Sequence, residues 1–343
     1  MNVDIKTARE LNQILRDKTR KKECLHPNSP AECKGKIVKA HTVQLALLKK
    51  IARNNHVYST AIDMRADKNP FCMARKGLKQ ASTFTGFCSY HDNQMFASIE
   101  KQAIELTESN VFLLTYRSMA RGFYVSRENN HLFMFSTDAP ILSDPHNGPI
   151  SGIFIEDPRF DEEVMRDLEV FAKMQNAYAR GDYAGIQFFA IELDSVPEIL
   201  CSGMTNVEFD FGGDRLQSVT QQQRQDLITL SLLPFRNKYG VAIFSWYGRS
   251  AVNERFIHSL LSLPGYDIPN AIVRFIFQHF ENFFVSPRWW DALTVAMQKC
   301  LLERFESTMF IESYLFIDLG PDGMNYVDWK VSNIKTNLKL SPR

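Results

Sequence analysis

Three cysteines and one histidine near the N-terminus constrain this chain more than any other feature. Cys24 and Cys33 flank the turn-rich segment CLHPNSPAEC, and Cys88 and His91 follow in the segment GFCSYHD. Thiolate and imidazole ligands in two such turns are typical of a tetrahedral zinc site, and the two-residue gap between Cys88 and His91 lets both side chains face one ion. The sequence therefore predicts a structural Zn²⁺ held by these four residues.

Other residues compete for the same metal. His26 stands between the first two cysteines, His41 ends a short strand, and Cys72 lies in a polar stretch. Each offers a donor atom of the same kind, so the exact set of four ligands stays open. Six cysteines in 343 residues, four of them before residue 90, indicate one metal site in a reducing compartment rather than a disulfide framework.

Basic residues crowd around the predicted metal site. The whole chain carries 40 Lys and Arg against 39 Asp and Glu, a formal net charge of +1, so only a local patch can attract nucleic acid. Lys34, Lys36 and Lys39 supply such a patch, and they are the candidate phosphate-binding residues. The alternative is an ordinary solvated surface, since charge runs usually serve solubility.

The same region resembles a known family. Cys24, the strand-like segment KIVKAH that ends in His41, and GFCSYHD are similar to the treble-clef modules of HNH-type nucleases. The resemblance implies that His41 is the general base that activates water, and that His91 or Asp92 holds a catalytic Mg²⁺ or Mn²⁺ ion. If His91 binds the structural zinc, Asp92 is the residue left for that ion. Asn54, Asn55 or His56 stands where the family has the asparagine that orients its histidine.

The rest of the chain has the pattern of an α+β protein. We expect a treble-clef-like module with a preceding helix in residues 1–108 and a larger α+β body in residues 109–343. Helical spacing covers residues 2–22, 43–53, 89–108, 161–178, 218–232 and, with interruptions, 253–316. Strands are predicted at 36–41 and within HLFMFST, GIFIED, IQFFAIEL and VAIFSWYG, a loop at 60–77, and a hairpin around the GPDG of the last segment.

Two patterns in the body suggest other functions. Arg274 and His279 have the spacing of the catalytic pair in HEPN-type ribonucleases, which they resemble in this respect alone. Trp289 and Trp290 follow five phenylalanines at near-helical spacing, which is typical of a hydrophobic core. If that cluster were exposed, the protein would instead be a non-enzymatic adaptor that docks a protein partner.

Absent features also narrow the function. The chain has no glycine-rich phosphate loop, GxSxG elbow or HExxH helix, which removes the common ATPase, hydrolase and metalloprotease classes. No apolar run reaches the roughly 18 residues of a membrane span, so we expect a cytoplasmic protein with no membrane contact. The sequence therefore predicts a zinc-binding, nucleic-acid-interacting protein, with metal-dependent cleavage as its enzymatic form and prokaryotic defence or a mobile element as its setting.

Overall fold

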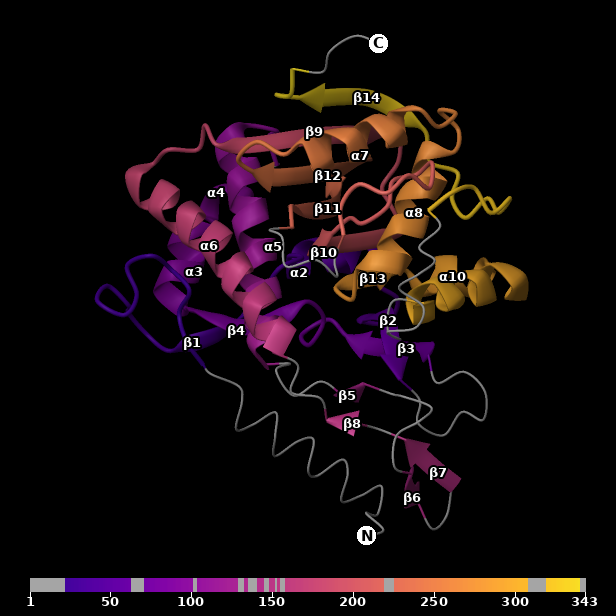
Figure 1. Cartoon of the computed structure of the whole chain (residues 1–343), viewed down its shortest axis with the longest axis horizontal. Helices are drawn as coiled ribbons and strands as arrows, with labels where there is room; N and C mark the ends of the chain where they lie inside the picture. The colour runs from indigo at the N-terminus through magenta and orange to yellow at the C-terminus, as the bar shows by residue number, and fades with distance from the viewer. Residues whose placement is uncertain are drawn as a thin grey trace.

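A single antiparallel sheet organises the protein. The computed structural model describes residues 22–62, 71–100, 104–128, 158–218, 225–307 and 319–339, and four short strands between residues 133 and 154. The sheet has eight strands in the order β14-β9-β12-β11-β10-β13-β2-β3. Helices cover both of its faces, so the protein is α+β as the sequence predicts (Figure 1).

The elements have the following bounds. The strands are β1 Ile37–His41, β2 His56–Ile62, β3 Phe71–Gly77, β4 Thr83–Cys88, β5 Phe133–Met134, β6 Ile141–Asp144, β7 Gly148–Ser151, β8 Ile153–Phe154, β9 Ile186–Leu193, β10 Ile199–Asn206, β11 Leu227–Phe235, β12 Tyr239–Tyr247, β13 Phe283–Val285 and β14 Val331–Thr336. The helices are α2 Leu45–Ile51, α3 Ser89–Met95, α4 Ala97–Glu100, α5 Glu108–Glu128, α6 Pro158–Arg180, α7 Ala251–Leu261, α8 Ile268–His279, α9 Pro287–Ala292 and α10 Val295–Ser307.

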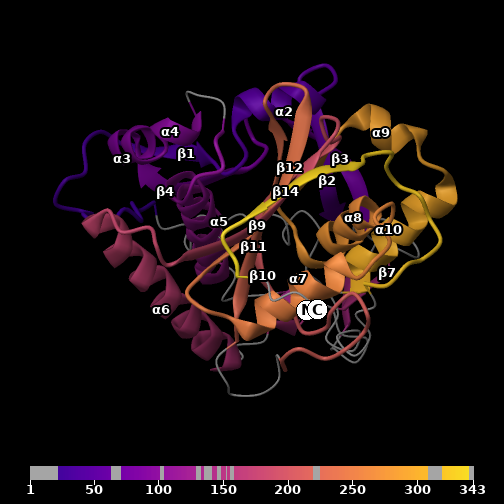
Figure 2. The ribbon, with the colours of Figure 1, turned by 90° about the horizontal axis from the view of Figure 1, so that it is seen from above.

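Two hydrophobic cores lie on opposite faces of the central strands. Along β9 the side chains alternate: Phe188 and Ala190 enter the core under α5 and α6, whereas Phe189 and Ile191 enter the core under α7 and α8. This alternation follows from the two-residue period of a strand. A sheet buried on both faces needs continuous apolar strands rather than alternating ones, and the runs IQFFAIEL and VAIFSWY meet that need. Figure 2 shows α5 and α6 on one side of the sheet and α7, α8 and α10 on the other.

The metal-ligand region is built on a separate two-stranded ribbon of β1 and β4. Its antiparallel register places Ile37 opposite Cys88 and His41 opposite Thr83, with a bulge in between. Between β1 and β4 the chain forms β2 and β3, and β2 pairs with β13 of the main sheet. The main sheet therefore crosses the predicted boundary at residue 108, and the ribbon and the body share structure.

Several sequence predictions are confirmed. Helices α2 and α6 fall within or around the predicted segments, β1, β9 and β12 match predicted strands, and the strand predicted in HLFMFST is the short β5, paired with β8. The helix predicted for residues 2–22 lies outside the described residues, apart from its last residue. None of the described helices combines the length and the apolar character that a membrane span requires.

Other predictions are wrong. Residues 227–235 form strand β11 rather than the end of a helix, and the predicted loop at 60–77 contains the end of β2 and all of β3. In the final segment β14 pairs with β9, and the first arm of the predicted hairpin lies outside the described residues. Helix α5 was not predicted, because residues 111–120 are all buried and so lack the polar face that marks an amphipathic helix.

Candidate metal centre

Backbone hydrogen bonds bring the two ligand segments together. The Leu25 N–H donates to the Gly86 carbonyl, and the N–H groups of Ser89 and Tyr90 donate to the carbonyls of Lys36 and Lys34. These bonds join the segments before and after Cys33 to the end of β4 and the start of α3. The turn back from Cys33 into β1 passes through Gly35, whose φ of 77° strains any residue with a side chain, and an added Cβ there would clash with Ser89 Oγ.

Four ligand atoms converge at the end of this ribbon. His91 Nδ1 lies 3.3 Å from Cys24 Sγ, 3.6 Å from Cys33 Sγ and 3.4 Å from Cys88 Sγ. All four ligand atoms lie within 4.8 Å of one another. Around a tetrahedral zinc, bonds of about 2.3 Å to sulfur and about 2.0 Å to nitrogen set the N-to-S distance at about 3.5 Å. The structure therefore brings together four side chains that could hold a metal ion.

The position of the ligands on α3 explains the Cys-x-x-His spacing. Cys88 is the N-cap of α3, and its Sγ accepts a hydrogen bond from the His91 N–H. His91 then lies one turn into the helix, so both side chains face the same point. Both are almost completely buried, whereas Cys24 and Cys33 are half-buried on the loop.

Crowding of these groups moves their pKa values in different directions. Burial raises the pKa of the Cys24 thiol to about 12. Burial also opposes ionisation of Cys88, but hydrogen bonds from the backbone of His91 and Lys34 outweigh it and lower the pKa of that thiol. Burial lowers the pKa of His91, which favours its neutral form. Neutral imidazole and thiolate are the forms that bind a divalent metal, and the positive charge of such an ion stabilises all three thiolates.

The competing ligands have other roles. His26 stacks on His91 with 3.7 Å between the ring centroids and 3° between the planes, and its Nδ1 accepts the Asn28 N–H. His41 lies at the opposite end of β1 from Cys88, and Cys72 belongs to β3 in the main sheet. His26 therefore supports the ring of His91, and the other two lie outside the cluster.

His41 and Asp92 share two charged neighbours. Arg117 and Glu100 both influence the pKa of His41, which burial lowers, and the pKa of Asp92, which burial raises. Arg117 is only 1% exposed, its Nη2 donates to Glu100 at 2.6 Å, and its guanidinium stacks over Phe96 at 3.9 Å. The sequence analysis missed Arg117, because one arginine within an apolar helix carries no pattern.

Several atoms in this polar group have no hydrogen-bond partner in the described part of the chain. They are His41 Nε2, Asp92 Oδ1, and Nε and Nη1 of Arg117, all of them buried. Among the residues the structure describes, His41 and Asp92 do not belong to a second set of three or more clustered metal ligands. Asn54 and Asn55, the counterparts suggested by the family resemblance, have φ values of 51° and 57° and form the turn into β2.

The three candidate phosphate-binding lysines are exposed. All three side chains are exposed to solvent: Lys34 and Lys36 lie on the segment that links Cys33 to β1, and Lys39 lies within β1. The Lys34 ammonium lies 4.9 Å from the centroid of the Tyr90 ring. Lys34 and Tyr90 are each adjacent in sequence to a metal ligand, Cys33 and His91 respectively, so this basic surface borders the metal centre.

The HEPN-like interpretation of α8 is wrong. Arg274 is fully buried, and its guanidinium forms two hydrogen bonds to the carboxylate of Asp267 and one to the Leu319 carbonyl. His279 is half-buried with its Nε2 enclosed, and burial lowers its pKa to about 4. The Arg274 guanidinium cannot reach a phosphate group in solvent, and it serves the packing of α8.

The aromatic cluster is also a core rather than a docking surface. Phe275, Phe277 and Phe283 are completely buried, and Trp290 is 7% exposed. Trp289 is half-buried, and its indole N–H donates to the Tyr326 carbonyl. The predicted adaptor surface is therefore absent from this part of the described chain, and the core interpretation is confirmed.

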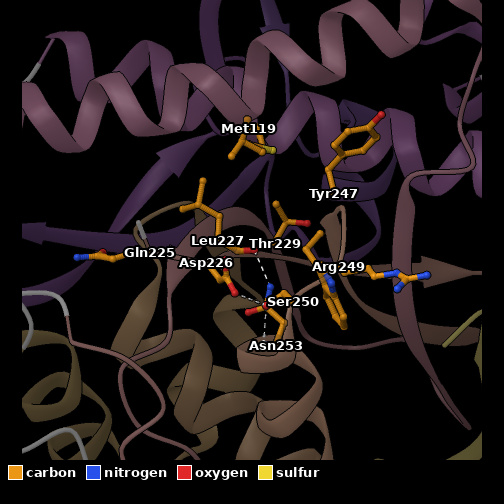
Figure 3. A pocket seen from close by; sticks show the side chains of 11 residues that line it. Met119, Gln225, Asp226, Leu227, Thr229, Tyr247, Arg249, Ser250 and Asn253 are labelled. Atoms are coloured by element: carbon orange, nitrogen blue, oxygen red, sulfur yellow. Dashed lines mark hydrogen bonds between the residues drawn. The ribbon is translucent and has the colours of Figure 1, made fainter. Parts of the chain in front are cut away.

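A pocket lies far from the metal ligands in the sequence, between α5, the ends of β11 and β12, and the start of α7 (Figure 3). Ser250 Oγ donates to Asp226 and accepts the Asn253 N–H, so it is the N-cap of α7 rather than an activated nucleophile. The Asn253 amide donates to the Leu227 carbonyl. These polar groups hold α7 against the sheet.

No protein-family model, curated protein or solved structure matches this chain. The function therefore has to be argued from the metal centre and its surroundings.

Proposed function

We propose that the protein binds nucleic acid through a basic surface that a structural zinc ion holds in place. The observation that carries this proposal is the convergence of Cys24, Cys33, Cys88 and His91 beside three exposed lysines. Three thiolates and one imidazole in a closed tetrahedral arrangement favour zinc over the oxygen-binding cations. Such a set leaves no open position for substrate, so the role of the ion is structural.

The position of the lysines supports the link between metal and nucleic acid. Lys34 follows Cys33 directly, and Lys36 accepts a backbone hydrogen bond from Ser89, the residue after Cys88. The ion therefore fixes the backbone from which these ammonium groups project. Because the net charge of the chain is only +1, this local patch, rather than a global field, supplies the attraction to phosphates.

Elemental analysis tests the zinc part of the proposal. We expect one zinc per chain in the wild type, less in Cys88→Ser, and an unchanged content in Cys72→Ser, whose cysteine lies on β3 outside the cluster. A wild-type protein purified without metal, and unable to take up zinc, would contradict it.

Salt-dependent binding tests the nucleic-acid part. Replacing Lys34, Lys36 and Lys39 by glutamine should weaken binding and reduce the slope of log K against log salt by about 2 to 3, since each phosphate contact contributes about 0.7 to 0.9. The matched control replaces three exposed lysines elsewhere, Lys238, Lys299 and Lys330. Equal slopes for both triple variants, or no binding by the wild type at low salt, would overturn the proposal.

Cleavage of the bound nucleic acid is a second candidate function. Burial lowers the pKa of His41, so the imidazole is neutral near pH 7, which is the form that a general base requires. His41 would take the proton of the attacking water, and Asp92 would help to hold Mg²⁺ or Mn²⁺. Cleavage by the wild type that His41→Ala abolishes without loss of zinc would support this candidate; no cleavage with either ion would remove it.

We also place the protein in the cytoplasm. None of the six cysteines forms a disulfide, and thiolate ligands persist where the compartment is reducing. Fractionation of cells that express the tagged protein tests this placement.

A further inference from the structure

Tyr90 occupies a distinctive position on the basic surface. It lies between the metal ligands Cys88 and His91 near the start of α3, and its side chain is 37% exposed, one of the few large apolar side chains that reach solvent. Its backbone N–H donates to the Lys34 carbonyl at 3.3 Å. The metal ligands and this bond therefore fix the backbone of an exposed aromatic residue.

The surroundings of the ring are basic. The Lys34 ammonium lies 4.9 Å from the ring centroid, and two further lysines are exposed, Lys36 before β1 and Lys39 within it. The nearby Glu32 carboxylate is engaged by the Asn28 side-chain amide. An aromatic ring among ammonium groups is the combination with which proteins bind single-stranded nucleic acid, because the ring stacks on a base and the ammonium groups contact phosphates.

The contact between Lys34 and Tyr90 does not prevent such stacking. A cation over an aromatic ring at an exposed site is a weak interaction, weaker than the stacking of a nucleobase on the same ring. An incoming base can therefore displace the flexible lysine side chain, whose ammonium is then free to contact the adjacent phosphate. A duplex offers no such base, because both faces of each internal base are already stacked.

We infer that Tyr90 is a stacking platform for an unpaired base, and that the nucleic acid bound at this surface is single-stranded. This inference rests on the proposed function and adds the class of nucleic acid to it. Sequence preference is expected to be small, since every base has a face that can stack.

The test compares two nucleic acids and three substitutions. Full-length, zinc-loaded protein is titrated with a fluorescent single-stranded oligonucleotide and with the blunt duplex of the same sequence. The wild type should bind the single strand more tightly. Tyr90→Ala should weaken single-strand binding about tenfold with little effect on the duplex, whereas Tyr90→Phe should retain the affinity. Tyr266→Ala, at an 81% exposed tyrosine on the loop before α8, is the control.

The outcomes separate this inference from the function on which it rests. Equal affinity for both nucleic acids, or a Tyr90→Ala variant that binds like the wild type, would overturn the inference even if the lysine variants still lose affinity. No binding to either nucleic acid would overturn both. Zinc content is measured for each variant, and if Tyr90→Ala loses zinc, Tyr90→Leu removes the ring while it keeps an apolar side chain.

Discussion

At the scale of single residues, the buried charge of Arg117 makes the stability of the fold sensitive to substitutions around it. Arg117 is 1% exposed and forms an ion pair with Glu100, whose side chain is 31% exposed. A buried charge that loses its partner is destabilising, whereas removal of both charges is often nearly neutral. The effect of a substitution here therefore depends on which member of the pair is changed.

We predict that Glu100→Gln lowers the free energy of unfolding by about 1–2 kcal/mol, and that Arg117→Met in the same chain restores part of the loss, because methionine can pack on Phe96. Urea unfolding at pH 7 measures both. The control is Glu303→Gln, which breaks an exposed pair with Lys299 and should cost less than about 0.5 kcal/mol. Equal losses for Glu100→Gln and Glu303→Gln would contradict the prediction.

The half-buried imidazole of His279 makes stability depend on pH. Burial lowers the pKa of His279 to about 4 in the folded chain, against 6.5 in the unfolded chain. Below pH 6.5 the imidazole takes up a proton in the unfolded chain but not in the folded chain. The free energy of unfolding therefore has its full value above pH 6.5 and falls as the pH approaches 4. The loss amounts to roughly 3 kcal/mol. Unfolding of the wild type and His279→Gln between pH 7 and 4.5 should show a shallower slope in the variant; parallel curves would contradict this assignment.

At the scale of secondary-structure elements, the sequence predicts what has a local cause. The ligand spacing of Cys88 and His91 follows from one turn at a helix start, and β9 and β12 follow from continuous apolar runs between turns. Helix α5 and strand β11 were missed because residues 111–120 of the helix and nearly all of the strand are buried, and a segment buried on every side has no apolar period that separates helix from strand. Neighbours that come from distant segments, such as Arg117 beside His41, have no local signal.

A buried polar network joins the metal-binding ribbon to the main sheet. The Asn282 amide donates both to Thr42 Oγ1 at 2.7 Å and to the Ser202 carbonyl at 2.6 Å. Thr42 in turn bonds Ser82, which accepts the Val43 N–H. This network connects the end of β1 to β10 through side chains that are all buried.

We expect Asn282→Ala to lower the free energy of unfolding by about 2–3 kcal/mol, because it leaves buried acceptors without donors. Asn333→Ala, at an exposed position of the edge strand β14, should change it by less than about 0.5 kcal/mol. Both are measured by urea unfolding with zinc in excess. A loss in Asn282→Ala no larger than that in Asn333→Ala would show that the network does not stabilise the contact.

At the scale of the whole molecule, metal binding and folding of the body should be coupled. The chain that links β1 to β4 supplies β2 and β3 to the main sheet, and α5 packs against β4 as well as against β9, β10, β11 and β12. A ribbon that unfolded by itself would have to expose part of the core that α5 shares with the body. Zinc binding to the folded state alone therefore stabilises the sheet as well as the ribbon.

We predict that thermal unfolding of the zinc-loaded chain is one transition, and that chelation lowers its midpoint instead of removing a separate early step. At zinc concentrations about 100 times the Kd the expected gain is about 2.7 kcal/mol, or about 5 °C. Cys88→Ser should unfold at the midpoint of the chelated wild type, and Cys72→Ser should keep the response to zinc. Scanning calorimetry measures these midpoints. Two transitions, of which only the first responds to zinc, would show instead that the ribbon folds independently of the sheet.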